Sequence, residues 1–401
     1  MCEATDKPNI FKYATKELSQ DAVICWLIEW SSYDGQGHEK LRECGQQFVK
    51  ALFAKHDKKV PENCGKPEIW RQDNNIDVLV SIGEYVLLIE DKTGTGDHSR
   101  QLERYYRLVC EGKTQAKEKD DSKNILPIYL KTGNQSFFDS LRIENLTPYP
   151  YKVFNRCDLL KVVEPYQGAH PILDDFRDLL KCLEDDTQSY REWREDGNGK
   201  VSYRSCEGFF RELENQLCVL NSDSGLVGFD NKDSVKPAQN TLRPNGYPFW
   251  GWGWVANRAG GFAGFWWYYK TVKSCGHDVD IYLQLEIKLD KPDARNPNKL
   301  NNRKLCFKVD TKGLNNDLSQ VKQDCHTRII KSGKLESSVG LARKPNRMRT
   351  GNTMTVAQWN DSDRQNPWLI FKPNGGPDIP ETVNNLIKAQ SILDRVGGNI
   401  K

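Results

Sequence analysis

Asp77, Glu90 and Lys92 together carry the groups that metal-assisted hydrolysis of a phosphodiester needs. Glu90 follows Asp77 by 13 positions, and Lys92 comes two positions later. The reaction requires two acidic oxygens to hold a divalent ion and a cation near the attacking water or the scissile phosphate. These three residues are therefore the candidate catalytic centre of a metal-dependent nuclease.

A β-hairpin would place the three residues on one face. Residues 76–80 and 85–90 are short apolar runs on either side of Ile82-Gly83-Glu84. If Gly83 and Glu84 form a type II′ turn, Ile82 faces Tyr85 and, by the same register, Asp77 faces Glu90. The Cβ atoms of directly opposite residues lie about 4.5–5.5 Å apart. Because side chains repeat every two residues along a strand, Lys92 lies on the same face.

The apolar context favours a functional interpretation over an ordinary exposed charge pair on a hairpin. Residues 86–89 have the composition of a strand buried on both faces. Placing Glu90 and Lys92 at its end is costly unless they meet a metal or each other. Asp91 points to the opposite face, where we expect a solvent-exposed or structural side chain.

Helices and a further strand are predicted around this hairpin. Residues 14–30 form an amphipathic helix in which Glu17 and Asp21 are one turn apart, and residues 39–55 form a second helix. Residues 99–110 have helical spacing, and 125–130 read as a strand in which Pro127 favours an edge or a bulge. The order is therefore helix, hairpin, helix and strand.

These motifs resemble those of the PD-(D/E)XK nuclease superfamily, and most closely its RecB-like members and an uncharacterised prokaryotic and phage group. The resemblance covers residues 9–165 and departs from the family pattern in having Ile76 where a proline usually precedes the first acid. The matching positions are Asp77 for the first acid, Glu90-Asp91-Lys92 for the ExK motif, Glu17 for the acid on the first helix, and Gln101 with Tyr105 for QxxxY.

The resemblance implies an α/β (α+β) fold with a restriction-endonuclease-like core of helix, antiparallel β-meander, helix and strand. It also implies a role for each matched residue. Asp77, Glu90 and the backbone carbonyl of Asp91 would hold Mg²⁺, for which Mn²⁺ would substitute, and Lys92 would orient or activate the water. The other matched residues would support the site: Glu17 by holding a second metal or a metal-bound water, Gln101 by positioning Lys92 or the phosphate, and Tyr105 by packing under or contacting the nucleic-acid backbone.

Other functions stay open beside DNA cleavage. The chain could be a non-catalytic binding or sensing protein on a nuclease-like scaffold, or an effector that cleaves RNA.

A second ExK sequence, Glu286-Ile-Lys288, is not a rival centre, because Asp278 and Asp280 lie too close upstream to face it across a hairpin. We expect it to lie in an alternating edge strand.

The second half of the chain differs from the first in charge and composition. At 401 residues and mean hydropathy −0.71, we expect a nuclease domain at residues 1–190 and a β-rich, aromatic and basic domain at 201–401. Residues 1–200 hold 29 Lys and Arg against 35 Asp and Glu, whereas 201–401 hold 29 against 20. This asymmetry is either ordinary surface composition or a sign of polyanion binding on the second half, for substrate recognition or regulation.

Two features of the second half are candidate nucleic-acid contacts. The basic loop, defined as Arg343, Lys344, Arg347 and Arg349, would contact phosphates, unless it is simply a solvated loop. Tryptophans at 250, 252, 254, 266 and 267 would either stack on bases or form one face of a sheet core, and alternate spacing favours the core.

Cysteine spacing and hydropathy exclude several classes of protein. The 12 cysteines include no CxxC pair, so no zinc ribbon or iron–sulfur motif is expected. No apolar run approaches membrane-spanning length and the first residues lack a secretory signal, so we expect a cytoplasmic protein without membrane contact. DNA is the expected partner, with RNA and a homodimer left open, and the resemblance suggests defence against foreign DNA or a mobile element.

Overall fold

The computed structural model divides the chain into two compact units. Unit 1 comprises residues 1–135 and 139–186, and unit 2 comprises residues 136–138 and 187–401. The residues described are 8–62, 64–94, 100–116, 124–146, 149, 151–195, 201–223, 251–256, 261–289, 303–311, 314, 318–335, 341–342, 353–360 and 366–397.

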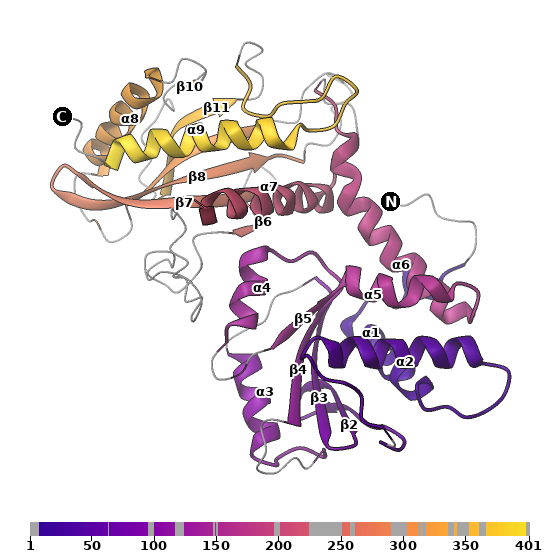
Figure 1. Ribbon diagram of the computed structural model, residues 1–401. Coiled ribbons are helices and arrows are strands. Elements are labelled where there is room, and N and C mark those ends of the chain that lie inside the picture. Colours follow the sequence, from indigo (N-terminus) through magenta and orange to yellow (C-terminus); the bar gives the residue numbers. More distant parts are fainter. Residues whose placement is uncertain are drawn as a thin grey trace. The chain divides into compact units, whose positions relative to one another are not determined.

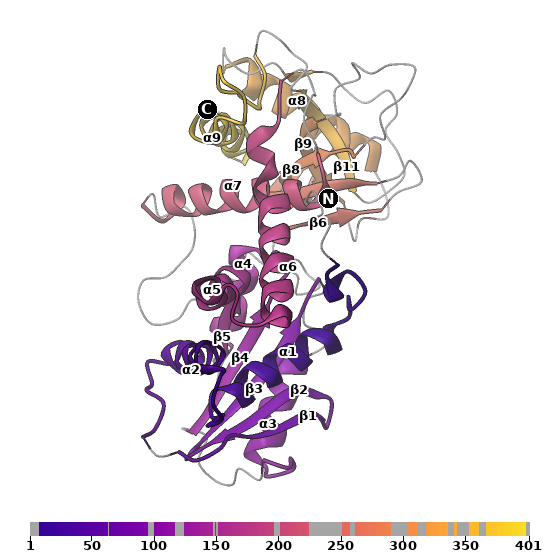
Figure 2. The same ribbon diagram turned by 90° about the vertical axis from the view of Figure 1, so that its right-hand side faces the viewer.

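Unit 1 is built on a five-stranded sheet with the order β1-β2-β3-β4-β5 (Figure 2). β1, β2 and β3 are antiparallel, whereas β4 runs parallel to β3 and β5 runs parallel to β4. The strands are β1 (Glu68–Asp73), β2 (Ile76–Ile82), β3 (Tyr85–Lys92), β4 (Ile125–Lys131) and β5 (Lys152–Asn155). The helices are α1 (Glu17–Trp30), α2 (Glu39–Ala54), α3 (Gln101–Cys110), α4 (Phe137–Glu144), α5 (Arg156–Val163) and α6 (Pro171–Gln188), with 3-10 turns η1 (Ile10–Lys12) and η3 (Glu164–Tyr166). The expected order of helix, antiparallel meander, helix and strand is confirmed.

The β2–β3 hairpin has the predicted register. Ile82 pairs with Tyr85 and Val78 with Ile89, and Gly83 has φ +59°, as the first central residue of a type II′ turn requires. One step further along this register, Asp77 and Glu90 face each other. The turn at Gly83 therefore sets the register that places Asp77 opposite Glu90.

The first strand of the meander, β1, was implied by the resemblance but not identified from the residues themselves. Asp73 pairs with Ile76 across Asn74 and Asn75, whose φ angles of +52° and +65° are those of a type I′ turn. β1 is largely exposed and polar, so it lacks the apolar alternation that reveals a half-buried strand.

Pro127 lies in a central strand, so the edge expectation for this segment is wrong. β4 runs between β3 and β5, but β5 pairs with it only from Ile128 onward. The Pro127 carbonyl instead accepts a hydrogen bond from His56 Nε2 at 3.1 Å. Because N–H and C=O of one residue face the same side in a parallel strand, the missing proline N–H costs no ladder hydrogen bond.

Helices cover both faces of this sheet. α1, α2 and α5 lie on one face and α3 on the other (Figure 1). On β3, Leu87 and Ile89 face the first layer, whereas Val86 and Leu88 face α3. Side chains alternate between the two faces of a strand, so Glu90 and Lys92 lie on the same face as Val86 and Leu88, on the α3 side.

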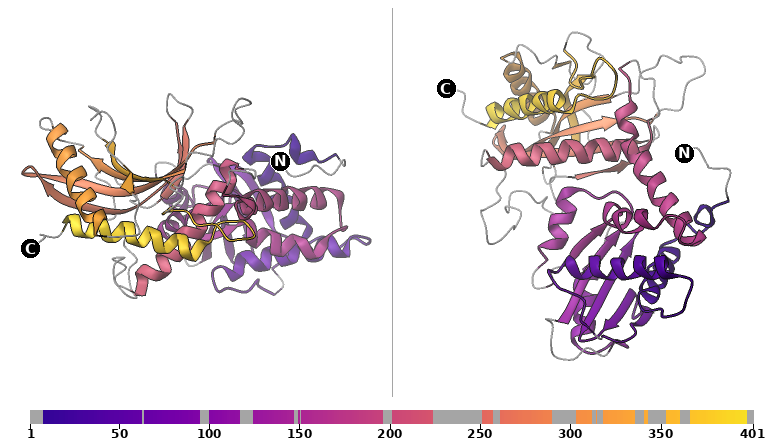
Figure 3. Two further views of the ribbon diagram at one scale, coloured as in Figure 1. Left: turned by 90° about the horizontal axis from the view of Figure 1, so that it is seen from above. Right: turned by 45° about the vertical axis from the view of Figure 1, so that its right-hand side comes forward.

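Unit 2 contains a six-stranded sheet with the order β10-β11-β9-β8-β7-β6, in which all pairs are antiparallel. Helices α7, α8 and α9 lie against one face of it (Figure 3). The strands are β6 (Gly251–Val255), β7 (Phe262–Ser274), β8 (His277–Ile287), β9 (Arg303–Asp310), β10 (Leu341–Ala342) and β11 (Thr353–Asn360). The helices are α7 (Tyr203–Asp223), α8 (Leu318–Lys334) and α9 (Ile379–Gly397), with a 3-10 turn η4 (Ser189–Glu192). The β-rich, aromatic-rich second half is confirmed, with three long helices that the sequence analysis did not predict.

The tryptophans of unit 2 divide between core and surface. Trp267 is fully buried and stacks on Phe265 with ring centroids 5.0 Å apart, as the core interpretation predicts. Trp254 is 44% exposed and meets Tyr203 edge-on. Trp250 and the basic loop of Arg343, Lys344, Arg347 and Arg349 lie outside the described residues, so their roles stay predictions.

The second ExK sequence has a structural explanation. Glu286 lies in β8, between β7 and β9, so the expectation of an edge strand is wrong. Its carboxylate pairs with Lys308 Nζ at 2.8 Å on the neighbouring strand.

No helix in the described parts of the chain is both long and apolar enough to cross a membrane.

Candidate active site

Three carboxylates surround the ammonium group of Lys92 at one end of the unit 1 sheet. Lys92 Nζ forms an ion pair with Glu90, and lies 3.6 Å from Asp77 Oδ2 and 4.0 Å from Glu17 Oε2. It also donates a hydrogen bond to the Asp91 carbonyl at 3.0 Å. The structure therefore brings together the predicted residues Glu17, Asp77, Glu90 and Lys92.

Three separate elements supply these groups. Glu90 and Lys92 end β3, and Asp77 is the second residue of β2. Glu17 is the first residue of α1, where a carboxylate is favoured by the helix dipole. Its Oε1 accepts a hydrogen bond from the backbone N–H of Thr93 at 3.1 Å, which ties the helix to the end of β3.

Glu90 is the most strongly perturbed acid of this cluster. Its side chain is completely buried, and its Oε2 has no hydrogen-bond partner among the described residues. Burial and the neighbouring charge of Asp77 raise the pKa of Glu90 to about 8, although the Lys92 ammonium opposes the shift. A buried carboxylate with an unpartnered oxygen is suited to binding a cation.

Lys92 is held in its charged form. Burial alone would lower its pKa, but the charges of Glu90, Asp77 and Glu17 outweigh burial and raise it above the ordinary lysine value. A permanently charged ammonium can donate hydrogen bonds and stabilise negative charge. It is poorly suited to accept a proton at neutral pH.

Asp91 contributes its backbone to the site and its side chain to the opposite face. Its N–H donates to Asp77 Oδ2 at 2.9 Å, while its carboxylate accepts a hydrogen bond from Gln20. The side chain is completely buried, so of the two expected roles the structural one is correct and solvent exposure is excluded. Burial, followed by the charge of Asp21, raises the pKa of Asp91 well above its usual range.

Residues that the sequence analysis did not assign hold this opposite face together. Thr132 donates to Gln20 Oε1 at 2.6 Å, which links α1 to the end of β4. Burial and the charge of Asp77 raise the pKa of Asp21 to about 6. Gln20 and Asp21 follow Glu17 by three and four positions on the same helix, so helical spacing was the signal that could have identified them.

Gln101 and Tyr105 interact with each other rather than with the carboxylates. Gln101 Nε2 donates to Tyr105 Oη at 3.0 Å, and Tyr105 is buried in the core beneath α3. No contact between Gln101 and Lys92 is found in the described part of the chain, so the roles of this pair stay predictions. Tyr151 is fully buried; its pKa is raised by burial and then by the charge of Glu90, and its hydroxyl donates to the Leu102 carbonyl at 2.9 Å.

The donor set fits a hard divalent cation. Asp77, Glu90 and the Asp91 carbonyl offer the oxygen ligands that Mg²⁺ and Mn²⁺ prefer, and the unpartnered Glu90 Oε2 lacks a partner that such an ion would provide. Within the described ranges no group of three His, Cys, Asp or Glu side chains is arranged to enclose an ion. The Lys92 ammonium lies among the carboxylates, so the carbonyl, water or substrate oxygens would have to complete the coordination.

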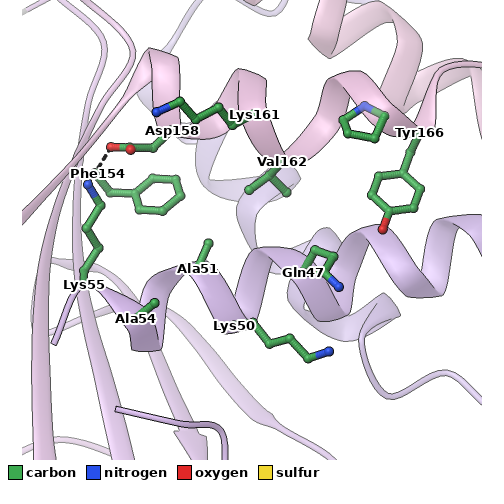
Figure 4. Close-up of a pocket in the computed structure, with 11 residues that line it drawn as sticks. Gln47, Lys50, Ala51, Ala54, Lys55, Phe154, Asp158, Lys161, Val162 and Tyr166 are labelled. Atoms are coloured by element: carbon green, nitrogen blue, oxygen red, sulfur yellow. Dashed lines mark hydrogen bonds and ion pairs between the residues drawn. The ribbon is translucent and has the colours of Figure 1, made fainter. Parts of the chain in front are cut away.

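A pocket elsewhere in unit 1 does not contain this chemistry. It has a volume of about 620 Å³ and lies between α2 and the α5–η3 segment (Figure 4). Its one carboxylate, Asp158, already pairs with Lys55 at 2.8 Å. The lining residues are Gln47, Lys50, Ala51, Ala54, Lys55, Phe154, Asp158, Lys161, Val162, Pro165 and Tyr166, and none belongs to the carboxylate cluster.

The raised pKa of Glu90 predicts that, as pH rises, the unfolding free energy of the metal-free protein falls and the stabilisation by Mn²⁺ grows. The folded state keeps the Glu90 proton up to about pH 8, whereas the unfolded chain releases it near 4.5, so the folded state binds more protons in this window. Glu90 therefore makes the free energy of unfolding of the metal-free protein fall as pH rises from about 4.5 to about 8. A cation needs the ionised carboxylate, so we expect the stabilisation by Mn²⁺ to grow over the same range. Thermal unfolding at pH 6 and pH 8 with and without Mn²⁺ measures both trends, and an equal Mn²⁺ shift at the two pH values would contradict the assignment of Glu90 as a ligand.

Comparison with known protein families identifies a match in the first half of the chain. Residues 8–199 match the family described as the PD-(D/E)XK nuclease superfamily. No curated protein and no solved structure matches the chain. The family match covers the whole carboxylate cluster and the five-stranded sheet that carries it.

Proposed function

Residues 8–199 belong to the PD-(D/E)XK nuclease superfamily, and we propose that the chain is a Mg²⁺-dependent nuclease that hydrolyses DNA phosphodiester bonds. The observation that carries the proposal is the Lys92 ammonium in contact with Glu17, Asp77 and Glu90. A buried cluster of this kind is costly as a purely structural feature, because both charged groups of a pair must lose water. It is favourable where a cation and a phosphate bind.

Asp77, Glu90 and the Asp91 carbonyl would hold the ion. When bound, Mg²⁺ lowers the pKa of water and shields the charge that develops on the phosphate. The chain supports this arrangement by burying Glu90 and by fixing Asp77 Oδ2 on the Asp91 N–H. Preorganised ligands of this kind lose little free energy in reorganisation when the substrate arrives.

Lys92 would position the attacking water and stabilise negative charge. Its ammonium has three hydrogens to donate; the Asp91 carbonyl accepts one, and the Glu90 carboxylate is paired with the same ammonium. Because its pKa is raised in the metal-free protein, we assign Lys92 to orientation and charge stabilisation rather than to proton abstraction. Glu17, which is partly exposed and tied to Thr93, would orient water on the open side of the cluster.

The remaining parts of the proposal concern the substrate. As the superfamily resemblance implies, Gln101 would position Lys92 or the phosphate, and Tyr105 would pack under or contact the nucleic-acid backbone. Unit 2 would recognise the substrate or regulate access to it. The net positive charge of residues 201–401 supports a polyanionic partner there. A role in defence against foreign DNA belongs to the same proposal.

A cleavage assay across nucleic-acid forms tests the proposed function. We expect purified protein with Mg²⁺ or Mn²⁺ to cleave DNA and EDTA to abolish cleavage. Asp77→Asn, which removes one ligand charge, is expected to lower the rate by more than the roughly 10- to 100-fold that loss of a ligand's outer hydrogen-bond partner costs. Linear, supercoiled and single-stranded DNA and RNA are compared under identical conditions. Cleavage of RNA alone would correct the substrate, and binding without cleavage of any form would favour a non-catalytic sensor on this scaffold.

A further inference from the structure

Gln72 has a backbone conformation that its residue type does not favour. It lies in β1 with φ +58°, in the left-handed region that side chains other than glycine and asparagine rarely adopt. The pairs on either side, Arg71 with Val78 and Asp73 with Ile76, leave Gln72 opposite Asp77. An unfavourable conformation directly opposite a proposed metal ligand calls for a physical explanation.

The Gln72 side chain bridges two carboxylates. Its Nε2 donates to Asp77 Oδ1 at 3.1 Å and to Asp21 Oδ2 at 3.2 Å. An amide nitrogen carries two hydrogens, so one group satisfies both acceptors, and the two acidic acceptors determine that nitrogen rather than oxygen faces them. The bridge reduces the repulsion between two negative groups that would otherwise turn away from each other.

This bridge fixes the orientation of Asp77. One carboxylate oxygen, Oδ1, is held by Gln72, and the other, Oδ2, accepts from the Asp91 N–H and lies beside Lys92. Donors on both sides therefore set the plane of the carboxylate. Without the amide, Oδ1 would lose this donor, and only the contacts of Oδ2 with the Asp91 N–H and Lys92 would hold the carboxylate.

Neighbouring contacts keep the strained backbone in place. Asp73 Oδ2 accepts a hydrogen bond from Gln115 N at 2.6 Å, and Asn74 Nδ2 donates to the Lys113 carbonyl at 2.8 Å. These bonds tie the β1–β2 turn to the segment that follows α3. The conformation of Gln72 is thus determined by its surroundings rather than by its own preference.

We propose that Gln72 is a positioning residue of the nuclease site, whose amide holds the Asp77 carboxylate in the orientation that binds the divalent ion. The inference rests on the proposed function, because Asp77 is a metal ligand only there. It also implies that this position favours function at the expense of folding stability, so the two can be separated by mutation.

Two substitutions at Gln72 and one at Asn75 make this separation measurable. Gln72→Gly removes the amide and relieves the left-handed strain, whereas Gln72→Met removes the amide and keeps both strain and side-chain length. Asn75→Gly introduces a glycine at φ +65° in the adjoining β1–β2 turn and leaves the bridge intact, so it controls for the effect of glycine itself. The three proteins are compared with wild type by thermal unfolding, by Mn²⁺ binding in calorimetry, and by DNA cleavage at a series of Mg²⁺ concentrations.

We expect both Gln72 variants to bind Mn²⁺ about tenfold more weakly and to need correspondingly more Mg²⁺ for half-maximal cleavage, as when an outer hydrogen-bond partner of a ligand is lost. Gln72→Gly should nevertheless unfold at a temperature equal to or higher than wild type, and Asn75→Gly should match wild type in Mn²⁺ affinity. A merely structural residue would lose stability and activity together.

Two results would overturn the inference. One is wild-type Mn²⁺ affinity in both Gln72 variants, and the other is a loss of affinity in Gln72→Gly that is matched by Asn75→Gly. Failure of the proposed function is a distinct outcome, because wild type itself would then neither bind Mn²⁺ nor cleave.

Discussion

Replacement of Lys92 by methionine is expected to reduce DNA cleavage by about 10³-fold, which is the scale expected for loss of one group that stabilises charge in the transition state. Methionine keeps most of the side-chain length and removes the ammonium that contacts Glu17, Asp77 and Glu90. The measurement is the single-turnover cleavage rate at saturating Mg²⁺, which separates this step from product release.

The same substitution should lower the unfolding free energy of the metal-free protein and increase the stabilisation that Mn²⁺ adds. Without the ammonium, the carboxylates lose their shared cation, and the metal-free protein is expected to lose about 2–3 kcal/mol of unfolding free energy at pH 8. Mn²⁺ should then stabilise Lys92→Met more than wild type, because the ion replaces the missing charge. Lys66→Met, at a lysine whose side chain is 73% exposed, is the matched control and should leave both quantities unchanged. Cleavage by Lys92→Met within tenfold of wild type would remove Lys92 from the proposed mechanism.

Glu90→Gln is expected to lower cleavage by a similar factor of about 10³ while making the metal-free protein more stable at high pH. The glutamine keeps the shape of the side chain but cannot carry the charge that a metal ligand needs. Since burial and the charge of Asp77 raise the pKa of Glu90 to about 8, the wild-type protein above that pH must bury a charge that the variant lacks. Its melting temperature at pH 8.5 without metal should therefore exceed that of wild type.

The stabilisation by Mn²⁺ should disappear in Glu90→Gln at every pH. Glu84→Gln is the matched control, because Glu84 is exposed in the turn of the same hairpin. It should reproduce wild-type cleavage, pH dependence and Mn²⁺ stabilisation. A Glu90→Gln protein that retains the Mn²⁺ shift would show that the ion binds elsewhere.

The pairing of the candidate catalytic residues could be predicted because it depends on local geometry. Gly83 favours one turn type, the turn type sets the register, and the register places Asp77 opposite Glu90. The strand period of two then carries Lys92 to the same face. Glu17 could be added only through the superfamily resemblance, since its contact with Thr93 spans 76 positions.

Other features could not be predicted because they depend on packing between distant segments. Gln72 reaches Asp21 across 51 positions and Gln20 reaches Asp91 across 71, and neither pair has a periodic signal. Pro127 was assigned to an edge because the sequence does not show where β5 begins to pair. The helices of unit 2 bury their apolar residues against strands that are distant in the sequence.

The amino-acid sequence by itself determined the chemistry of this chain: two carboxylates and a lysine on one hairpin, and the helices that accompany them. These follow from turn and strand geometry, which act over a few residues. Only the tertiary structure decided that the Lys92 ammonium lies among three carboxylates, that Glu90 is buried with an unpartnered oxygen, and that a strained glutamine orients Asp77. Burial and hydrogen-bond direction depend on every segment that packs around a side chain, so they are fixed only when the whole unit folds.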